Sequence, residues 1–185
     1  MNFVKGKDRL VLVLPALGIV IKFPIIRAKE VFKKAFSDIR DKHWKAFARY
    51  FSTWSPESQY VASGKLLRGI VSNKRERRLW KRTRNAFLVP TFFSFFGLVN
   101  VEKYSKPYEG DYIDLWDQIR RITNEEAYLN PHQFSEVKNY SLVDGKLKMI
   151  DYGGHGSEWV IVKWGTRIMA QFDSQFRYAK SSGKD

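Results

Sequence analysis

Residues 140–153 carry the clearest structural signal in the chain: Tyr140-Ser141-Leu142-Val143-Asp144-Gly145-Lys146-Leu147-Lys148-Met149-Ile150-Asp151-Tyr152-Gly153. Two short apolar runs flank Asp144-Gly145, a dipeptide typical of the two-residue turn of a β-hairpin. The second run ends at Asp151, just before an aromatic residue and a glycine pair. The stretch therefore predicts a hairpin that delivers a carboxylate at its outgoing end.

Asn139 comes directly before this hairpin, and His132-Gln133-Phe134 comes shortly before Asn139. This order of residues resembles the catalytic segment of the protein-kinase-like fold, a group that includes protein kinases and small-molecule phosphotransferases. The resemblance implies that Asn139 and Asp151 hold magnesium against the phosphates of ATP, because hard cations favour oxygen ligands.

Segments upstream resemble the same family. Val20-Ile21-Lys22 is similar to its Val-Ala-Ile-Lys strand, which implies that Lys22 contacts the α- and β-phosphates. Glu76 would be the acidic partner of that lysine. The adenine edge is expected near residues 102–105. The implied nucleotide-binding residues are Lys22, Glu76, Asn139 and Asp151. Lys22 could instead be an edge-strand lysine that limits aggregation.

One departure from the family pattern concerns catalysis. The family places its catalytic Asp five residues before the Asn, and Phe134 stands there in this chain. A phenyl ring can neither orient an attacking hydroxyl nor accept its proton. Glu136 could substitute only if the loop were rearranged. We therefore expect no catalytic residue at this position.

Other departures concern size. No Gly-x-Gly-x-x-Gly motif precedes the first expected strand, where only Gly6 is present, so we expect the chain to begin at the family's second strand. The predicted fold is α+β and kinase-like, truncated, with a small antiparallel sheet and a helical lobe. We expect one domain over 1–185, with an N-lobe at 1–104, a helical insertion at 28–64 and a reduced C-lobe at 105–185.

Apolar periodicity predicts the remaining elements. Strands are expected over 9–14, 19–23, 91–96 and 98–104. Helices are expected over 28–50, from about Leu66 through Asn73 to Lys81, and over 112–122, and Asn73 with Glu76 forms a helix-start signal. Residues 179–185 have the composition of a frayed tail. Trp44, Trp54, Trp80 and Trp116 are expected mostly in the core, with base stacking as the minority interpretation.

Composition restricts the chemistry and the partners. The 185 residues are 44% hydrophobic and contain no cysteine, which excludes disulfides, thiol nucleophiles and thiolate metal sites and favours a reducing, cytoplasmic setting. Three scattered histidines make a zinc site improbable. No apolar run predicts a spanning helix, so we expect no membrane partner. A formal charge of +14 favours a macromolecular partner that is an acidic protein or a nucleic acid.

A dense basic cluster supports that expectation, although a plain solvated helix face would also explain it. Its members are Lys74, Arg75, Arg77, Arg78, Lys81, Arg82 and Arg84. Our first hypothesis is a pseudokinase that acts by binding a macromolecule and keeps a residual site for ATP and Mg. The alternatives are an active, atypical phosphotransferase, and a small, basic, phage-like protein that binds nucleic acid or inhibits a host factor.

Overall fold

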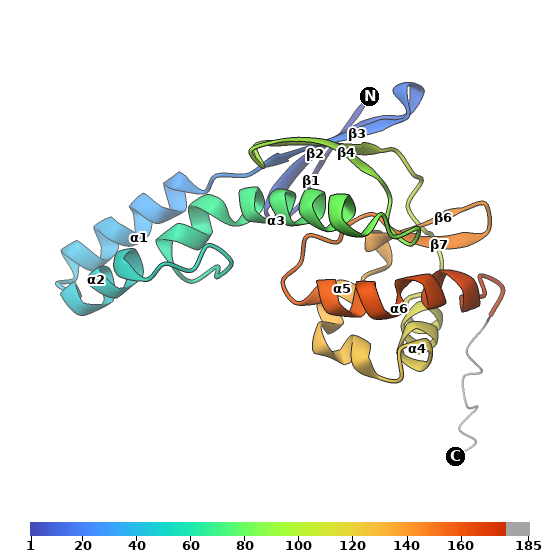
Figure 1. The fold of residues 1–185 in the computed structure, drawn as a ribbon. Coiled ribbons are helices and arrows are strands. Elements are labelled where there is room, and N and C mark those ends of the chain that lie inside the picture. The colour runs from blue at the N-terminus through green and yellow to red at the C-terminus, as the bar shows by residue number, and fades with distance from the viewer. Residues whose placement is uncertain (177–185) are drawn as a thin grey trace, which may run out of the picture. The chain divides into compact units, whose positions relative to one another are not determined.

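The computed structural model describes residues 1–176 and is an α+β protein (Figure 1). It divides into two compact units. Unit 1 comprises Met1–Arg78 and Thr91–Tyr104, and unit 2 comprises Leu79–Pro90 together with the chain from Ser105 onward. Segment 79–90, which the sequence placed in the N-lobe, thus belongs with the second unit. The predicted tail at 179–185 lies outside the described residues.

A five-stranded antiparallel sheet forms the centre of unit 1, with the strand order β1-β2-β3-β5-β4. The strands are β1 (Asn2–Lys5), β2 (Arg9–Leu14), β3 (Ile19–Pro24), β4 (Thr91–Phe95) and β5 (Val99–Lys103), with a short 3-10 helix η1 (Pro15–Leu17) between β2 and β3. The β2–β3 and β4–β5 pairs confirm the predicted strands. β1 corrects the expectation that no strand precedes residue 9. β3 lies between β2 and β5, so the interpretation of Lys22 as an edge-strand lysine is wrong.

The register places polar side chains on one face of this sheet. Lys22 stands opposite Val11 on β2 and opposite Asn100 on β5. Because strand residues two apart share a face, Arg9 and Glu102 lie on the same face as Lys22. Helix α3 (Ala62–Thr83) approaches the sheet closely: a Cβ added at Gly97, in the β4–β5 turn, would lie 2.5 Å from the Ile70 carbonyl oxygen. The sheet and α3 thereby enclose several ionisable groups.

The helices of unit 1 differ from the prediction in two places. The single helix expected over 28–50 is a pair, α1 (Ala28–Arg40) and α2 (Trp44–Ser52), joined by a three-residue turn at 41–43. The helical region expected from about Leu66 is a single helix that begins at Ala62, so the start signal at Asn73 lies in its interior. Asn73 is therefore no cap: it is buried in mid-helix, and its amide nitrogen donates to the Gly97 carbonyl at 2.9 Å.

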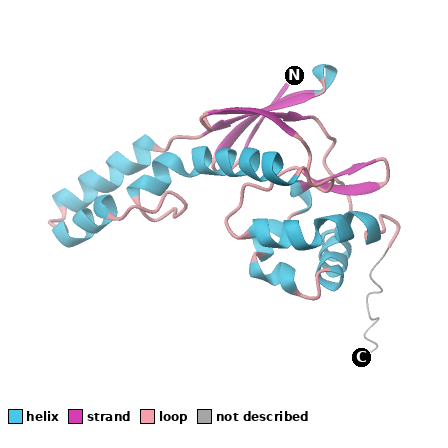
Figure 2. Cartoon of the chain, in the orientation of Figure 1, coloured by secondary structure: helices cyan, strands magenta, loops and turns pink. Residues whose placement is uncertain are grey.

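Unit 2 contains the predicted hairpin and a helical core (Figure 2). β6 (Tyr140–Val143) pairs with β7 (Lys146–Met149), and Asp144 and Gly145 have φ of 51° and 72°, as a tight two-residue turn requires. The helices are α4 (Tyr112–Ile122), α5 (Pro131–Ser135) and α6 (Ser157–Gln171), with 3-10 helices η2 (Glu126–Leu129) and η3 (Val137–Asn139). α4 confirms the helix predicted at 112–122.

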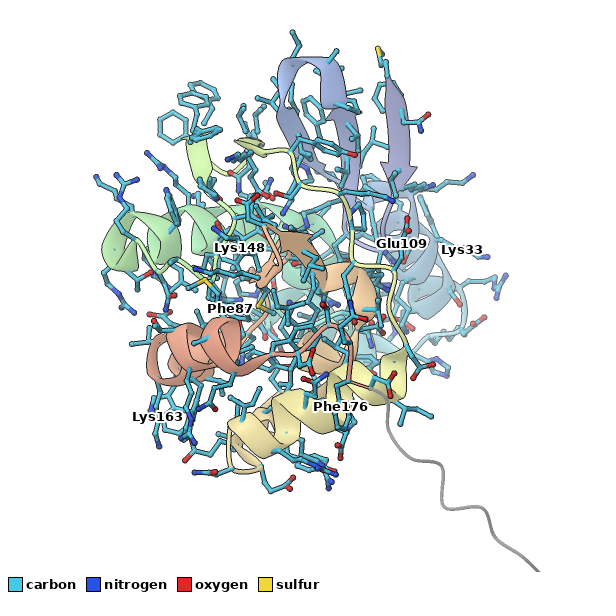
Figure 3. The ribbon with its side chains drawn as sticks, turned by 90° about the vertical axis from the view of Figure 1, so that its right-hand side faces the viewer. Lys33, Phe87, Glu109, Lys148, Lys163 and Phe176 are labelled. Carbon is cyan, nitrogen blue, oxygen red and sulfur yellow. The ribbon has the colours of Figure 1, made fainter. Side chains whose placement is uncertain are left out.

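The core of unit 2 is apolar and aromatic. Phe87, labelled in Figure 3, is fully buried and packs with Leu115, Tyr140 and Ile161. Trp80 and Trp116 pack against this core, as predicted. Trp44 and Trp54, in unit 1, are 58% and 76% exposed, so the prediction of core positions for them is wrong. None of the helices within residues 1–176 has the length and apolarity needed to cross a membrane.

Candidate functional site

A buried ionic cluster in unit 1 centres on Lys22. Its ammonium group lies 3.1 Å from Glu76 Oε1 on α3 and 2.8 Å from Glu102 Oε2 on β5. Lys22, Glu76 and Glu102 are 6%, 0% and 2% exposed. The structure therefore brings together the lysine and the glutamate that the sequence paired. It also adds a second carboxylate from Glu102, which the sequence had assigned only to the stretch where an adenine edge was expected.

Arg9 completes the cluster, and the sequence analysis did not identify it. Arg9 Nη1 lies 2.7 Å from Glu76 Oε1, so one carboxylate receives hydrogen bonds from two cations. Asn100 donates to Glu76 Oε2 at 3.4 Å and to the Asn73 carbonyl at 2.9 Å. The signal available was that alternate residues of a strand share a face: Arg9 lies two positions from Val11, the residue opposite Lys22.

Burial and neighbouring charges shift the pKa values of the two carboxylates in opposite directions. Burial favours the neutral form of both, but Arg9 and Lys22 outweigh it at Glu76 and hold the pKa of Glu76 far below its usual range. At Glu102, burial and the negative charge of Glu76 raise the pKa well above the usual range. Of the two carboxylates, Glu102 is therefore the one that holds a proton more readily.

In unit 2 the backbones of Asn139 and Asp151 lie side by side at the outgoing end of the hairpin. The Asn139 carbonyl oxygen accepts hydrogen bonds from the backbone N–H of Ile150 at 2.8 Å and of Asp151 at 3.4 Å. The Asn139 amide nitrogen donates to the Gln133 carbonyl at 2.9 Å, and the Gln133 amide nitrogen donates to the Asp151 carbonyl. Three short segments are therefore held in one hydrogen-bonded group.

Phe134 occupies the position where the family pattern has its catalytic Asp. Its side chain is fully buried in the core of unit 2, and its carbonyl accepts a hydrogen bond from the Tyr140 hydroxyl at 2.8 Å. Glu136, the proposed substitute, has a 45% exposed side chain and lies 3.1 Å from the Lys138 ammonium. His132 is exposed. The described residues therefore put no acid–base group at the position of Phe134.

Asn139 and Asp151 in unit 2 carry the kinds of side-chain oxygen that Mg²⁺ takes as ligands. Mg²⁺ is commonly held by one or two protein oxygen ligands, while waters and phosphate oxygens complete its octahedron. Asn139 and Asp151 offer one amide and one carboxylate from adjacent chain segments. Residues 1–176 contain no group of three or more His, Cys, Asp or Glu side chains able to hold a metal ion. A permanent, all-protein metal site is thus not formed there.

Several side chains of the basic cluster form contacts within the protein. Arg75 pairs with Glu57, Arg77 donates to the Thr91 carbonyl at 2.6 Å, and Arg82 pairs with Glu158. Arg84 lies over the Trp80 ring at 5.4 Å. Lys74, Arg78 and Lys81 are exposed on α3. The sequence counted seven positive charges, but the structure leaves fewer of them for a partner.

A separate groove of about 420 Å³ lies in the helical part of unit 1. Its lining includes Lys34, Arg49, Tyr50 and Tyr60 from α1, α2 and the segment that follows α2. No residue that the sequence predicted for a site contributes to this groove.

Comparison of the chain with protein-family models, with curated proteins and with solved structures found no match.

Proposed function

We propose that the protein is a catalytically impaired, kinase-like protein of two lobes that acts by binding a macromolecular partner and keeps a residual site for ATP and Mg²⁺. The observation that carries the proposal is the pair of Lys22 on β3 and Glu76 on α3, within the sheet order β1-β2-β3-β5-β4. In kinases, a lysine on the third strand pairs with a glutamate on the helix that follows.

The charge of the cluster supports a nucleotide. Two cations, Lys22 and Arg9, meet at the Glu76 carboxylate, and an anionic phosphate beside them would form charge-assisted hydrogen bonds with both. Lys22 and Arg9 would supply this attraction, and Glu76 would fix the position of the lysine. Asn139 and Asp151 would hold Mg²⁺, which would neutralise charge on the phosphates when bound.

The buried Phe134 supports the impairment. Phosphoryl transfer depends largely on positioning and on electrostatics, while an aspartate orients the attacking hydroxyl and accepts its proton. A ring packed in the core does neither. The lack of cysteine fits a reducing compartment, and we propose the cytoplasm.

Calorimetric titration with ATP, with and without magnesium, tests the nucleotide site. We expect saturable binding that Lys22→Ala and Asp151→Ala each weaken at least tenfold, because each change removes one of the charges proposed to meet the phosphates or the metal. Lys146→Ala and Asp144→Asn, on the β6–β7 hairpin but outside the cluster, serve as matched controls and should bind like the unaltered chain. The absence of heat at millimolar ATP would contradict the nucleotide site.

An active, atypical phosphotransferase is the second candidate, and the adjacent Asn139 and Asp151 favour it. Magnesium and alignment would then replace base catalysis. Radiolabelled ATP distinguishes the two candidates. Phosphorylation of the chain itself or of an added substrate, lost in Asp151→Ala, would establish the enzyme and overturn the impaired form.

A further inference from the structure

The α1–α2 pair exposes apolar side chains that a packed helical hairpin would bury. Phe32, Phe36 and Ile39 on α1 are 63%, 70% and 41% exposed, and Trp44 and Phe51 on α2 are 58% and 45% exposed. Only Val31, Tyr50 and Ala62 form the small buried cluster of this region, with Leu66 packed against it. Much of the apolar surface of the pair therefore remains in water, which is unfavourable for a helix face without a partner.

The exposed side chains of the two helices lie on the same side of the pair. At about 100° per residue, Phe32, Phe36 and Ile39 follow the buried Val31 by about a quarter of a turn. Trp44 and Phe51 follow the buried Tyr50 in the same rotational sense by about a third of a turn. The short turn at 41–43 makes the helices antiparallel neighbours, and Figure 1 shows them side by side. The buried residues Val31 and Tyr50 mark the sides on which the two antiparallel helices face each other. Because each exposed apolar stripe is rotated from that side by a similar angle in the same sense, both stripes point to the same side of the pair.

Cations border this apolar strip. Lys29 and Lys33 lie a further quarter of a turn or so beyond the stripe of α1, and Lys45 lies about as far beyond the stripe of α2. All three are exposed, and none has an ion-pair partner among the described residues. Lys33 is labelled among the side chains in Figure 3. The strip is thus apolar in its middle and positive along both outer edges.

We propose that this face of the α1–α2 pair docks on the surface of an anionic phospholipid bilayer, with the aromatic side chains at headgroup depth and the three lysines among lipid phosphates. Helices that lie in the interface combine an apolar face rich in Trp, Phe and Leu with a basic polar face. Such helices need no spanning segment. The proposal revises our expectation of no membrane partner, which considered spanning helices alone, and it does not depend on nucleotide binding.

Charge favours a bilayer over a second copy of the chain. Stacking two copies of the strip face to face would bring their unpaired cations together, and like charges repel. An anionic surface meets the same cations with opposite charge, and each Lys or Arg near such a surface strengthens binding about fivefold.

Flotation of the full chain with vesicles tests the proposal. We expect binding to vesicles of phosphatidylglycerol and phosphatidylcholine, little binding to phosphatidylcholine alone, and weaker binding in high salt. Combined Phe36→Glu and Trp44→Glu should lower the affinity at least tenfold, because carboxylates oppose both insertion and charge attraction. Trp159→Glu, a 49% exposed tryptophan on α6, is the matched control and should bind normally.

A charge variant separates insertion from simple attraction. Lys29→Gln with Lys33→Gln should lower the affinity about 25-fold, whereas Lys106→Gln with Lys138→Gln, which changes the net charge equally, should have a much smaller effect. The substituted residues are exposed, so circular dichroism should show folded chains throughout. Failure to float with anionic vesicles would overturn the proposal. So would equal binding of the Phe36→Glu, Trp44→Glu chain, or a self-association that this variant abolishes.

Discussion

At the scale of single residues, Glu102 and Glu76 have the same side chain and opposite protonation behaviour. Both are buried and both contact Lys22. Arg9 reaches Glu76 at 2.7 Å, and this additional cation decides which carboxylate ionises. The pKa of Glu102 is raised, first by burial and then by the charge of Glu76, so the folded chain keeps this proton to a higher pH than the unfolded chain does. A measurable dependence of stability on pH follows.

Glu102→Gln should remove that dependence. A glutamate in the unfolded chain loses its proton near pH 4.3, so the protein must take up a proton at Glu102 on folding at any higher pH below its raised pKa. The contribution of Glu102 to stability is therefore greatest below about pH 4.3 and falls as pH rises, by at most about 1.4 kcal/mol per pH unit. Gln is neutral at every pH and keeps the hydrogen-bonding shape.

Urea unfolding at pH 5, 6.5 and 8 measures this effect. The free energy of unfolding of the unaltered chain should decline more steeply with pH than that of Glu102→Gln. Glu76 does not interfere, because its lowered pKa makes its contribution disappear only toward acid pH. Glu136→Gln, at a half-exposed carboxylate, is the control and should leave the slope unchanged. Parallel curves for Glu102→Gln and the unaltered chain would show that Glu102 ionises in the folded protein.

At the scale of elements, the sequence predicted those whose signals are local. The Asp144-Gly145 turn, the strands at 9–14 and 19–23 and the helix at 112–122 follow from turn chemistry and periodicity, and the structure confirms them. The errors arose where neighbours override local signals. Asn73 is a residue type that favours helix N-caps, but its side-chain amide donates a hydrogen bond to the carbonyl of Gly97, which belongs to another segment. β1 is only four residues long and fully exposed, so its sequence carried no burial pattern.

The candidate site likewise contains residues that the order along the chain predicts and residues that only the folded structure brings in. Lys22, Glu76, Asn139 and Asp151 were identified because the resemblance to kinases fixes their order along the chain. Arg9 and Glu102 entered the cluster only through the register of the sheet. The expected core positions of Trp44 and Trp54 were wrong because amphipathic spacing does not tell which apolar faces find a partner.

Asp111 provides a test of local signals at the element scale. Its carboxylate caps α4 by accepting hydrogen bonds from the backbone N–H of Ile113 at 2.7 Å and of Asp114 at 3.2 Å. Asp111→Ala should lower the free energy of unfolding by about 1 kcal/mol, because two amides at the helix start lose their acceptor. Glu109→Ala, at an exposed pair with Lys106, should change it by less than about 0.5 kcal/mol. Equal effects in chemical denaturation would show that the cap contributes nothing.

At the scale of the whole molecule, the formal charge of +14 is not one uniform attraction for anions. Arg75 and Arg82 are satisfied by carboxylates, and Arg77 by the Thr91 carbonyl. Lys74 and Lys81 on α3 remain exposed, as do the cations bordering the α1–α2 strip. The charge available to a large polyanion is therefore smaller and more dispersed than the sequence indicates.

Binding to duplex DNA should consequently be weak, independent of sequence and steeply dependent on salt. The slope of log K against log salt is about −0.9 per phosphate contacted, so Lys74→Gln with Lys81→Gln should make it shallower by at most about 1.8. Lys5→Gln with Lys138→Gln is the control of equal net charge and should change the slope less. Fluorescence anisotropy across a salt series measures both. Affinity that distinguishes sequences and persists at physiological salt would instead favour nucleic-acid binding as the function, because released counterions alone do not discriminate between base sequences.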